Sequence, residues 1–277
     1  MSKKKFPVIL SYDCDFQALW TSRDIENTNR PVTLSLGNYG YYEGLPRILR
    51  ILDKYDIKGT FNLVGCMVEK FPQHVVDIYE KGHELACHGY NHIWPEKFEK
   101  KEDEAEEYTK TNKAIKDITG YEVKGFRSPA WEFSLNTPDI LEEMGLLYSS
   151  NMMDFDSIHQ LEVFGKKRKL LEIPIHWALD DAAYWLYSTK IIGKAMQPLD
   201  AVENVFKIHF NVLYDEWKTL EGRENTVFSL TMHPQIIGLP PRAQVMENVI
   251  KHIKQHDDVE FVRAIDLAEK HIDLLEK

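Results

Sequence analysis

The sequence predicts a single α/β domain, residues 1–277, folded as a distorted barrel of seven or eight βα units. Two observations favour this architecture. Apolar runs of strand type alternate with segments of helical periodicity, which is typical of parallel βα units. The length of 277 residues suits an α/β barrel, and a content of 43% hydrophobic residues can fill a large core. An open, doubly wound sheet is the alternative arrangement of the same elements.

Eight short apolar runs are the expected strands. The first is FPVILSYD, and the third, HELACH, is an apolar run that ends abruptly at a histidine. Their lengths fit strands better than buried helices. In chain order, the expected strands are residues 6–13, 59–65, 83–88, 124–131, 146–152, 169–177, 226–234 and 259–267.

Helical segments separate these runs. Residues 43–57 carry leucine and isoleucine at helical spacing, and a proline in the first turn favours a helix start at 136–145. The segment 95–120 is so rich in charge that we interpret it as an outer helix with a solvated face. The expected helices are 43–57, 73–82, 95–120, 136–145, 198–220, 242–257 and a C-terminal segment after residue 267.

Two long segments interrupt the alternation, residues 16–42 after the first strand and residues 178–197 after the sixth. Long loops of this kind are usually lids or interfaces. Aromatic residues in the first segment favour association of several copies of the chain. We therefore expect a homo-oligomer whose sites are bordered by these loops.

Bulk composition argues against several classes of protein. The formal net charge of −10 disfavours binding to a nucleic-acid backbone, which requires a basic face. No apolar run approaches the roughly 18 residues of a membrane span. The first 13 residues lack the features of a signal peptide, and three cysteines cannot form a closed set of disulfides. We expect a cytoplasmic protein with buried thiols and no membrane partner.

Polar side chains gather where the apolar runs end. In a parallel barrel these positions share one rim, and that rim carries the active site. The residues in question are Asp13 and Asp15, His88 and His92, Arg127 and Trp131, Asp180 and Asp181, and His233.

Taken singly, these features have ordinary explanations: Asp-x-Asp serves turns, a histidine pair often decorates a surface, and an arginine often forms a surface ion pair. Taken together, they supply the parts of metal-assisted amide hydrolysis. Two histidines and a carboxylate form an open metal site. A second carboxylate can accept a proton from water, and a histidine on a distant strand can protonate a leaving nitrogen.

The motifs SYDCD, TFNLVG, HELACHGYNH, GFRSPAW and LTMHP, in this order from residue 7 to residue 267, resemble the polysaccharide deacetylase superfamily, also called the NodB-homology or carbohydrate esterase 4 superfamily. The resemblance implies a distorted (β/α)7-type barrel and a divalent metal, most often zinc. It implies Asp15, His88 and His92 as metal ligands, Asp13 as general base held by Arg127, His233 as general acid, Trp131 and Leu230 as pocket walls, and Asp180 or Asp181 as the orienting carboxylate, with Asp181 also a candidate substrate contact.

One departure from the superfamily pattern narrows the resemblance. Extracellular members usually read Asp-Asp-Gly, whereas this chain reads Asp13-Cys14-Asp15, followed by a long segment with Trp20 and several tyrosines. This resembles the subgroup of intracellular peptidoglycan-deacetylase-like, allantoinase-like and cyclic imide-hydrolysing proteins, which tend to be oligomeric. We expect Trp20 at the substrate. The expected substrate is an N-acetylated sugar or a small cyclic amide or imide, and the alternative is a non-catalytic barrel that binds a ligand or metal.

Overall fold

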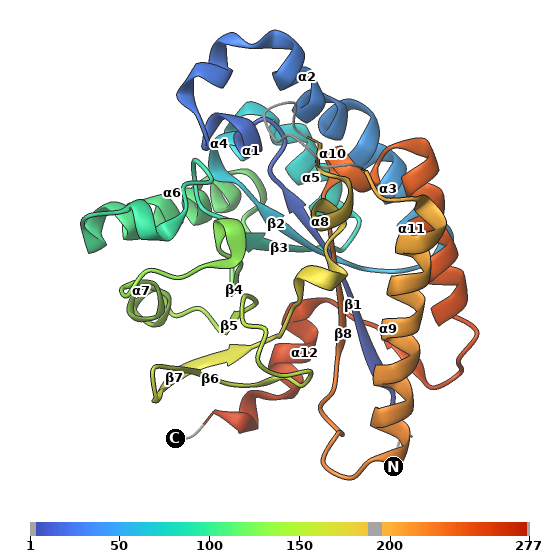
Figure 1. The fold of residues 1–277 in the computed structure, drawn as a ribbon. Coiled ribbons are helices and arrows are strands. Elements are labelled where there is room, and N and C mark those ends of the chain that lie inside the picture. The colour runs from blue at the N-terminus through green and yellow to red at the C-terminus, as the bar shows by residue number, and fades with distance from the viewer. Residues whose placement is uncertain (1–3, 188–195, 276–277) are drawn as a thin grey trace.

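The computed structural model describes residues 4–187 and 196–275, and its centre is a strongly curled sheet (Figure 1). The strand order is β6-β7-β5-β4-β3-β2-β1-β8, and β9 pairs with the beginning of β1. All pairs are parallel except β6 with β7. The strands are β1 Phe6–Cys14, β2 Thr60–Leu63, β3 Glu84–Cys87, β4 Gly125–Phe126, β5 Tyr148–Ser149, β6 His159–Val163, β7 Lys166–Glu172, β8 Phe228–Met232 and β9 Val259–Phe261.

The predicted distorted barrel is confirmed, and one irregular contact completes its wall. Seven parallel strands follow one another around the sheet, from β8 through β1 to β7. Beyond β7 the chain returns to β8 through a single parallel bridge between Asp180 and Thr231. The gap between β7 and β8 is therefore joined by the same residue that we expected near the site.

A hairpin at the sheet edge was not expected from the sequence. The run 169–177 corresponds to β7, which begins at Lys166 and pairs with the antiparallel β6. The turn between them is Phe164-Gly165, and both residues have positive φ, 51° and 74°. Two left-handed residues match the twist of a two-residue hairpin.

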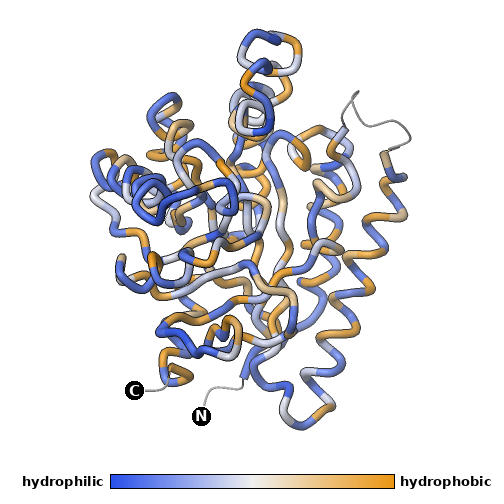
Figure 2. Tube along the Cα trace, turned by 60° about the vertical axis from the view of Figure 1, so that its left-hand side comes forward, coloured by the Kyte–Doolittle hydropathy of each residue, from blue (hydrophilic) through white to orange (hydrophobic). Residues whose placement is uncertain are grey.

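Helices cover the outside of the sheet (Figure 1). In α3 the residues Leu45, Ile48, Leu49 and Leu52 face the core at helical spacing, as expected. In Figure 2, hydrophobic and hydrophilic residues alternate along the turns of the long helix α9. The helices are α3 Leu45–Tyr55, α4 Gly65–Lys70, α5 Pro72–Glu80, α6 Lys101–Thr119, α7 Thr137–Glu143, α9 Leu199–Thr219, α10 Pro234–Ile237, α11 Pro240–Ile253 and α12 Ala264–Lys270.

Three expectations about individual elements need correction. The segment 95–120 is a short 3-10 turn, Pro95–Lys97, followed by α6, and its acidic face is partly buried at Glu104 and Glu107. The last expected strand keeps only three residues in β9. Its second half is the start of α12, where the backbone N–H and the guanidinium of Arg263 both donate to the carboxylate of Asp266.

The segment 16–42 is mainly helical. It contains α1 (Ala18–Thr21), a 3-10 turn (Ile25–Asn29) and α2 (Pro31–Tyr39), and a π turn (Gly40–Gly44) leads into α3. Glycines allow close packing here: a Cβ on Gly44 would lie 2.1 Å from the carbonyl oxygen of Pro234. The segment is therefore tied to the chain that follows β8.

The second long segment, 178–197, is described in part. A 3-10 turn (Trp177–Leu179) and α8 (Asp181–Trp185) follow β7, whereas residues 188–195 lie outside the described residues. Within residues 4–187 and 196–275, no helix is long and apolar enough to cross a bilayer.

Candidate active site and metal centre

The first strand delivers two carboxylates to the same rim of the barrel. β1 is buried along its whole length, and Asp13 and Asp15, two residues apart, point to the same side. Both side chains are 1% exposed. Phe16 then takes a positive φ of 46°, and the chain leaves the sheet for α1. Two carboxylates held this deeply need charged or metal partners.

The histidine pair is placed by a loop rather than by a helix. His88 follows β3, and His92 is reached through Gly89 and its own positive φ of 58°. Glu107 on α6 holds this loop, because its carboxylate accepts hydrogen bonds from the backbone N–H groups of Tyr90 (3.0 Å) and Asn91 (2.7 Å). No local pattern predicts this role, since Glu107 lies within a run of charge that we interpreted as a solvated face.

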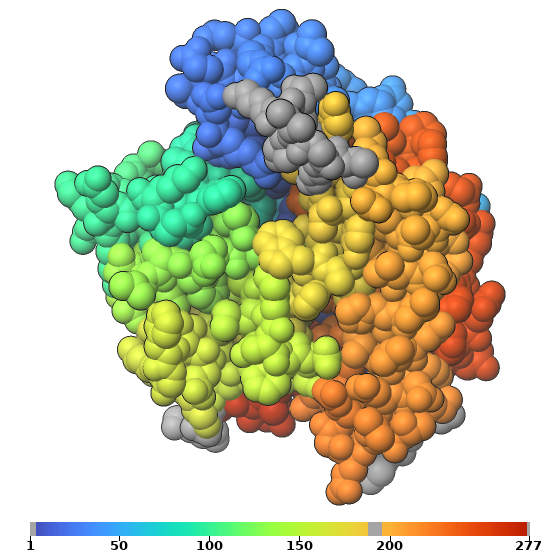
Figure 3. Space-filling model, in the orientation of Figure 1, coloured from blue at the N-terminus to red at the C-terminus, as the bar shows by residue number. Residues whose placement is uncertain are grey.

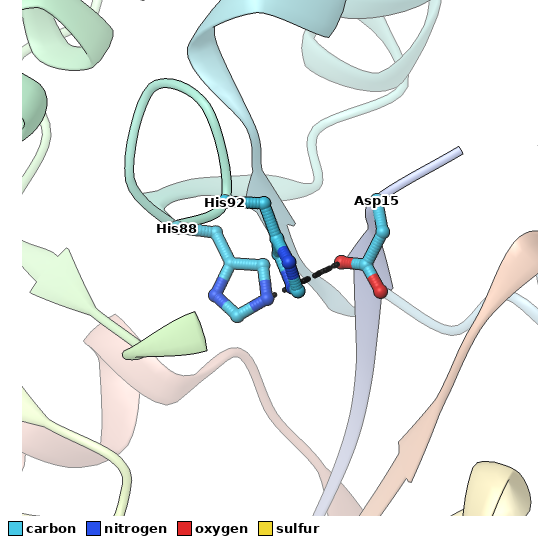
Figure 4. A group of neighbouring side chains, drawn as sticks. All are labelled: Asp15, His88 and His92. Carbon is cyan, nitrogen blue, oxygen red and sulfur yellow. Dashed lines mark ion pairs between the residues drawn. The ribbon is translucent and has the colours of Figure 1, made fainter. Parts of the chain in front are cut away.

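Asp15, His88 and His92 converge on one point (Figure 4). The Nε2 atoms of His88 and His92 lie 3.3 Å and 3.5 Å from Oδ1 of Asp15. This oxygen is buried and has no hydrogen-bond partner. A buried, unsatisfied carboxylate oxygen facing two imidazole nitrogens is the arrangement that a divalent cation would complete.

Outer partners set the orientation of both imidazoles. Nδ1 of His88 donates to the carbonyl oxygen of Arg127 at 2.8 Å, so Nε2 is the ring nitrogen that faces Asp15. Burial acts to lower the pKa of His88, but the carboxylates of Asp13 and Asp15 raise it above its usual value. Nδ1 of His92 lies 3.2 Å from the hydroxyl of Ser22, in the segment 16–42. Burial lowers the pKa of His92 to about 4, which keeps this ring neutral and available as a ligand.

Asp13 is held by three donors, one on β2 and two from the segment that follows β4. It accepts from Arg127 Nη1 at 3.1 Å and from Asn62 Nδ2 at 2.6 Å on Oδ1, and from Trp131 Nε1 at 3.4 Å on Oδ2. Burial acts to raise the pKa of Asp13, but the guanidinium of Arg127 and the neighbouring histidines hold it below its usual value. Asp13 is therefore an ionised carboxylate beside the predicted metal ligands.

Arg127 is buried inside the barrel, with 2% of its surface exposed. In addition to Asp13 it donates to both the carbonyl and the hydroxyl oxygen of Ser150, and to the hydroxyls of Ser11 and Thr231. Its planar donor fork is thus fixed by several strands, which explains how a buried charge can be tolerated. Asn62 lies in the motif TFNLVG, and the sequence alone predicted no role for it.

The third group lies at the end of β8. Nδ1 of His233 donates to Oδ1 of Asp181 at 2.7 Å, and the backbone N–H of His233 donates to Oδ2 at 3.0 Å. The other ring nitrogen, Nε2, lies 3.7 Å from Oδ2 of Asp15. Burial acts to lower the pKa of His233, but Asp180 and Asp181 raise it well above its usual value. His233 can therefore keep a proton that faces the cluster.

The structure distinguishes the two carboxylates that the sequence left open. Asp181 makes both contacts to His233 and is 0% exposed. Asp180 lies 3.5 Å from the same nitrogen and caps Ala182 through Oδ1, and burial raises its pKa to about 8. Although Asp180, Asp181 and His233 could hold a cation as a set, both oxygens of Asp181 are already used by His233.

A cavity of about 420 Å³ opens above these groups. The face of the molecule in Figure 3 is hollowed where the blue N-terminal helices meet the green and yellow segments. Trp131 and Trp177 stack at 4.0 Å between ring centroids and form one wall. The lining residues are Asp13, Asp15, Leu19, Arg23, His88, His92, Trp94, Glu96, Ala130, Trp131, Glu132, Trp177, Asp180, Ala182, Leu186 and His233.

Three expected substrate contacts lie elsewhere. Leu230 is packed into the core on β8, and Asp181 stands behind His233 rather than in the lining. Trp20 lines a separate outer cavity of about 870 Å³. Packing decides these positions: Leu230 and Asp181 are buried, whereas Trp20 is half-buried and faces the outer cavity. Trp94, Trp177 and Arg23 take part in the lining instead.

Comparisons with known proteins agree with this arrangement. Residues 26–149 match the model of the family Polysaccharide deacetylase. The chain is 28% identical over 290 residues to a peptidoglycan deacetylase of Helicobacter pylori, with 96% of each chain covered. A solved structure from Mycobacterium smegmatis, which bears the name polysaccharide deacetylase, superposes with a TM-score of 0.88 at 29% identity, covering 99% of this chain and 92% of that one. The Puue allantoinase shares the fold, with a TM-score of 0.82 at 22% identity and coverage of 97% and 90%.

Proposed function

We propose that this chain, which is similar to the polysaccharide deacetylase family over residues 26–149, is a hydrolase of C–N bonds other than peptide bonds and works with a divalent metal held by Asp15, His88 and His92. The observation that carries this proposal is the buried, unpaired Oδ1 of Asp15 facing two imidazole nitrogens. Zinc suits two histidines and a carboxylate, and we propose it as the resident ion.

A divalent cation bound here would polarise the amide carbonyl and lower the pKa of water near it. Asp13 is the general base, since Arg127 and Asn62 keep it ionised and aimed into the cavity. His233 is the general acid, because Asp181 keeps a proton on the ring that faces the cavity. The two groups share the same cavity, so one can accept the proton of water while the other protonates the departing nitrogen.

The proposed substrate is an N-acetylated sugar or a small cyclic amide or imide. A cavity of about 420 Å³ with a tryptophan wall suits a single flat or pyranose ring. The alternative is a barrel that binds a ligand or metal without turnover. That alternative predicts that a base, a ligand or an acid is missing, whereas all three kinds of group are present in this cavity.

Metal analysis combined with two product assays tests the proposal. Zinc-loaded protein should release acetate from an N-acetylated sugar or open a cyclic imide. His88→Asn should lose stoichiometric metal and activity. His83→Asn is the matched control, because His83 is a buried histidine directly before the start of β3, and its Nδ1 accepts a hydrogen bond from the backbone N–H of Gly59. Full metal content in His88→Asn would refute the ligand assignment.

Asp13→Asn and His233→Asn should lower the rate by about 10² to 10⁴ while metal stays bound. Full activity in either variant would contradict the assigned role.

We also propose that residues 1–277 form one domain and that the protein is a cytoplasmic homo-oligomer. The apolar side chains of Ile25, Val32 and Leu36 in the segment 16–42 are exposed, which supports association. Light scattering of the purified protein gives the subunit number, and a monomer would contradict this part of the proposal. Limited proteolysis and fractionation of the source cells address the other two parts.

A further inference from the structure

Arg23 stands out in the cavity above the metal cluster. It follows α1 in the segment 16–42, and it is the only lysine or arginine among the described residues that line this cavity. It also lines the outer cavity of about 870 Å³, so it lies where the two cavities meet. The proposed mechanism does not use this residue.

The guanidinium of Arg23 has no hydrogen bond or ion pair with the rest of the described chain. The side chain of Arg23 is exposed at the cavity mouth, although protein surrounds part of it. This partial burial lowers the pKa of Arg23, and the carboxylate of Asp15 acts to raise it. Arginine offers five donors in a flat fork that matches a carboxylate. An unpaired fork at the mouth of a cavity is a ready site for an anion.

Local contacts fix Arg23 relative to the metal ligands. The hydroxyl oxygen of the neighbouring residue, Ser22, lies 3.2 Å from Nδ1 of His92. Asn27 donates from its side chain to the carbonyl oxygen of Trp20 at 2.8 Å, which closes the turn around residue 23. The backbone that carries Arg23 is therefore attached to the same imidazole that borders the cation position.

We propose that Arg23 binds a carboxylate of the substrate, so that the enzyme acts on an amide or imide whose molecule also carries a carboxylate; this inference rests on the proposed function. The other charged residues of the lining favour one orientation. Glu96 and Glu132 on the rim repel an anion, and Arg23 attracts it. The amide then lies toward Asp13 and His233, and the ring lies against Trp131.

Two matched pairs of probes test this inference. N-acetylglucosamine and N-acetylmuramic acid differ by a lactyl carboxylate on the same sugar. Dihydrouracil and dihydroorotate differ by a carboxylate on the same ring. Binding to zinc-loaded protein is measured by calorimetry and turnover by product release, for the wild type, Arg23→Gln, Arg23→Lys and the control Arg30→Gln. Arg30 lines only the outer cavity and donates to Asn27.

The wild type should bind the carboxylate member of at least one pair more tightly than its neutral partner. A preference in the sugar pair would indicate an acidic amino-sugar substrate, and a preference in the ring pair would indicate a cyclic amide or imide with a carboxylate. In Arg23→Gln this preference, expressed as a ratio of dissociation constants or KM values, should fall by about 10- to 100-fold, the usual size of a hydrogen bond to a charged group. Arg23→Lys should restore part of it, since charge remains without the fork. Arg30→Gln should leave the ratio as in the wild type.

The inference is overturned if Arg23→Gln leaves the ratio unchanged, or if the wild type binds neither carboxylate better than its neutral partner. A loss of bound zinc in Arg23→Gln, with equal losses for both members of a pair, would instead show a structural role and also overturn it. Turnover is a separate readout. Selective binding without hydrolysis of any probe would count against the proposed hydrolysis of these substrates and leave the role of Arg23 standing.

Discussion

The contact between Asp181 and His233 allows a quantitative prediction about pH dependence. Asp181→Asn keeps the size of the side chain and removes its charge. The lost interaction is a buried, charge-assisted hydrogen bond of 2.7 Å, worth about 1.5 to 3 kcal/mol. Since one pKa unit corresponds to about 1.4 kcal/mol, the pKa of His233 should fall by about one to two units.

The sign of the effect follows from the role of the histidine. A general acid must carry its proton, so activity is lost as pH rises through its pKa. In Asp181→Asn the alkaline limb of the kcat/KM profile should therefore move toward acid by about one to two units. Asp180→Asn is the comparison variant: Asp180 also raises the pKa of His233, but it lies farther away, at 3.5 Å, and burial raises its own pKa to about 8, so this variant should shift the limb less than Asp181→Asn.

The assay is a pH profile of kcat/KM for zinc-loaded wild type and both variants, with metal content measured in parallel. Because any bound cation affects all three proteins alike, the comparison isolates the carboxylates. A larger shift in Asp180→Asn than in Asp181→Asn would refute the assignment of Asp181 as the orienting group. An unshifted alkaline limb in Asp181→Asn would refute His233 as the acid.

Three further predictions concern the support of the site and the base of the barrel. Glu107→Gln should weaken zinc binding by about 10- to 100-fold in a chelator competition, because the loop between His88 and His92 loses its charged acceptor; Glu106→Gln, an exposed neighbour on α6, should not. Asn62→Ala removes a hydrogen bond of 2.6 Å to Asp13, which should raise the pKa of this carboxyl. The acidic limb of the kcat/KM profile should therefore move to higher pH by about one unit, and an unchanged limb would exclude Asp13 as the base. Burial raises the pKa of Glu84 from 4.5 to about 7. The unfolded chain therefore loses this proton at lower pH than the folded protein, and the free energy of unfolding should fall by about 3 kcal/mol as pH rises from about 4.5 to 7. Denaturant titrations should show that this pH dependence disappears in Glu84→Gln and persists in Glu80→Gln, an exposed control at the end of α5.

Local sequence patterns were sufficient to predict the framework of the fold. Apolar runs located eight of the nine strands, helical periodicity located α3, and a proline in the first turn located α7. These signals are short-range, since burial of one face imposes a period on neighbouring residues. The hairpin of β6 and the start of α12 were not predicted, because a positive φ in Phe164 and the hydrogen bonds from Arg263 to Asp266 depend on individual contacts.

The cluster itself could be anticipated from the sequence because strand ends of a parallel barrel share one rim. Asp13, Asp15, His88, His92, Arg127 and His233 each follow or end an apolar run, and the structure brings them together. What the sequence alone determined was thus the set of chemical groups and the side of the barrel on which they gather.

Only the tertiary structure decided how those groups are held and which of them reach the cavity. Glu107 accepts hydrogen bonds from the loop between His88 and His92, although its helix has the charge pattern of a solvated helix. Asp181, rather than Asp180, accepts the hydrogen bond from His233. Leu230 is a core residue, and Arg23 rather than Trp20 lines the cavity from the segment 16–42. The physical reason is that each of these assignments depends on distances between residues far apart in the chain, which packing sets and which no local pattern encodes.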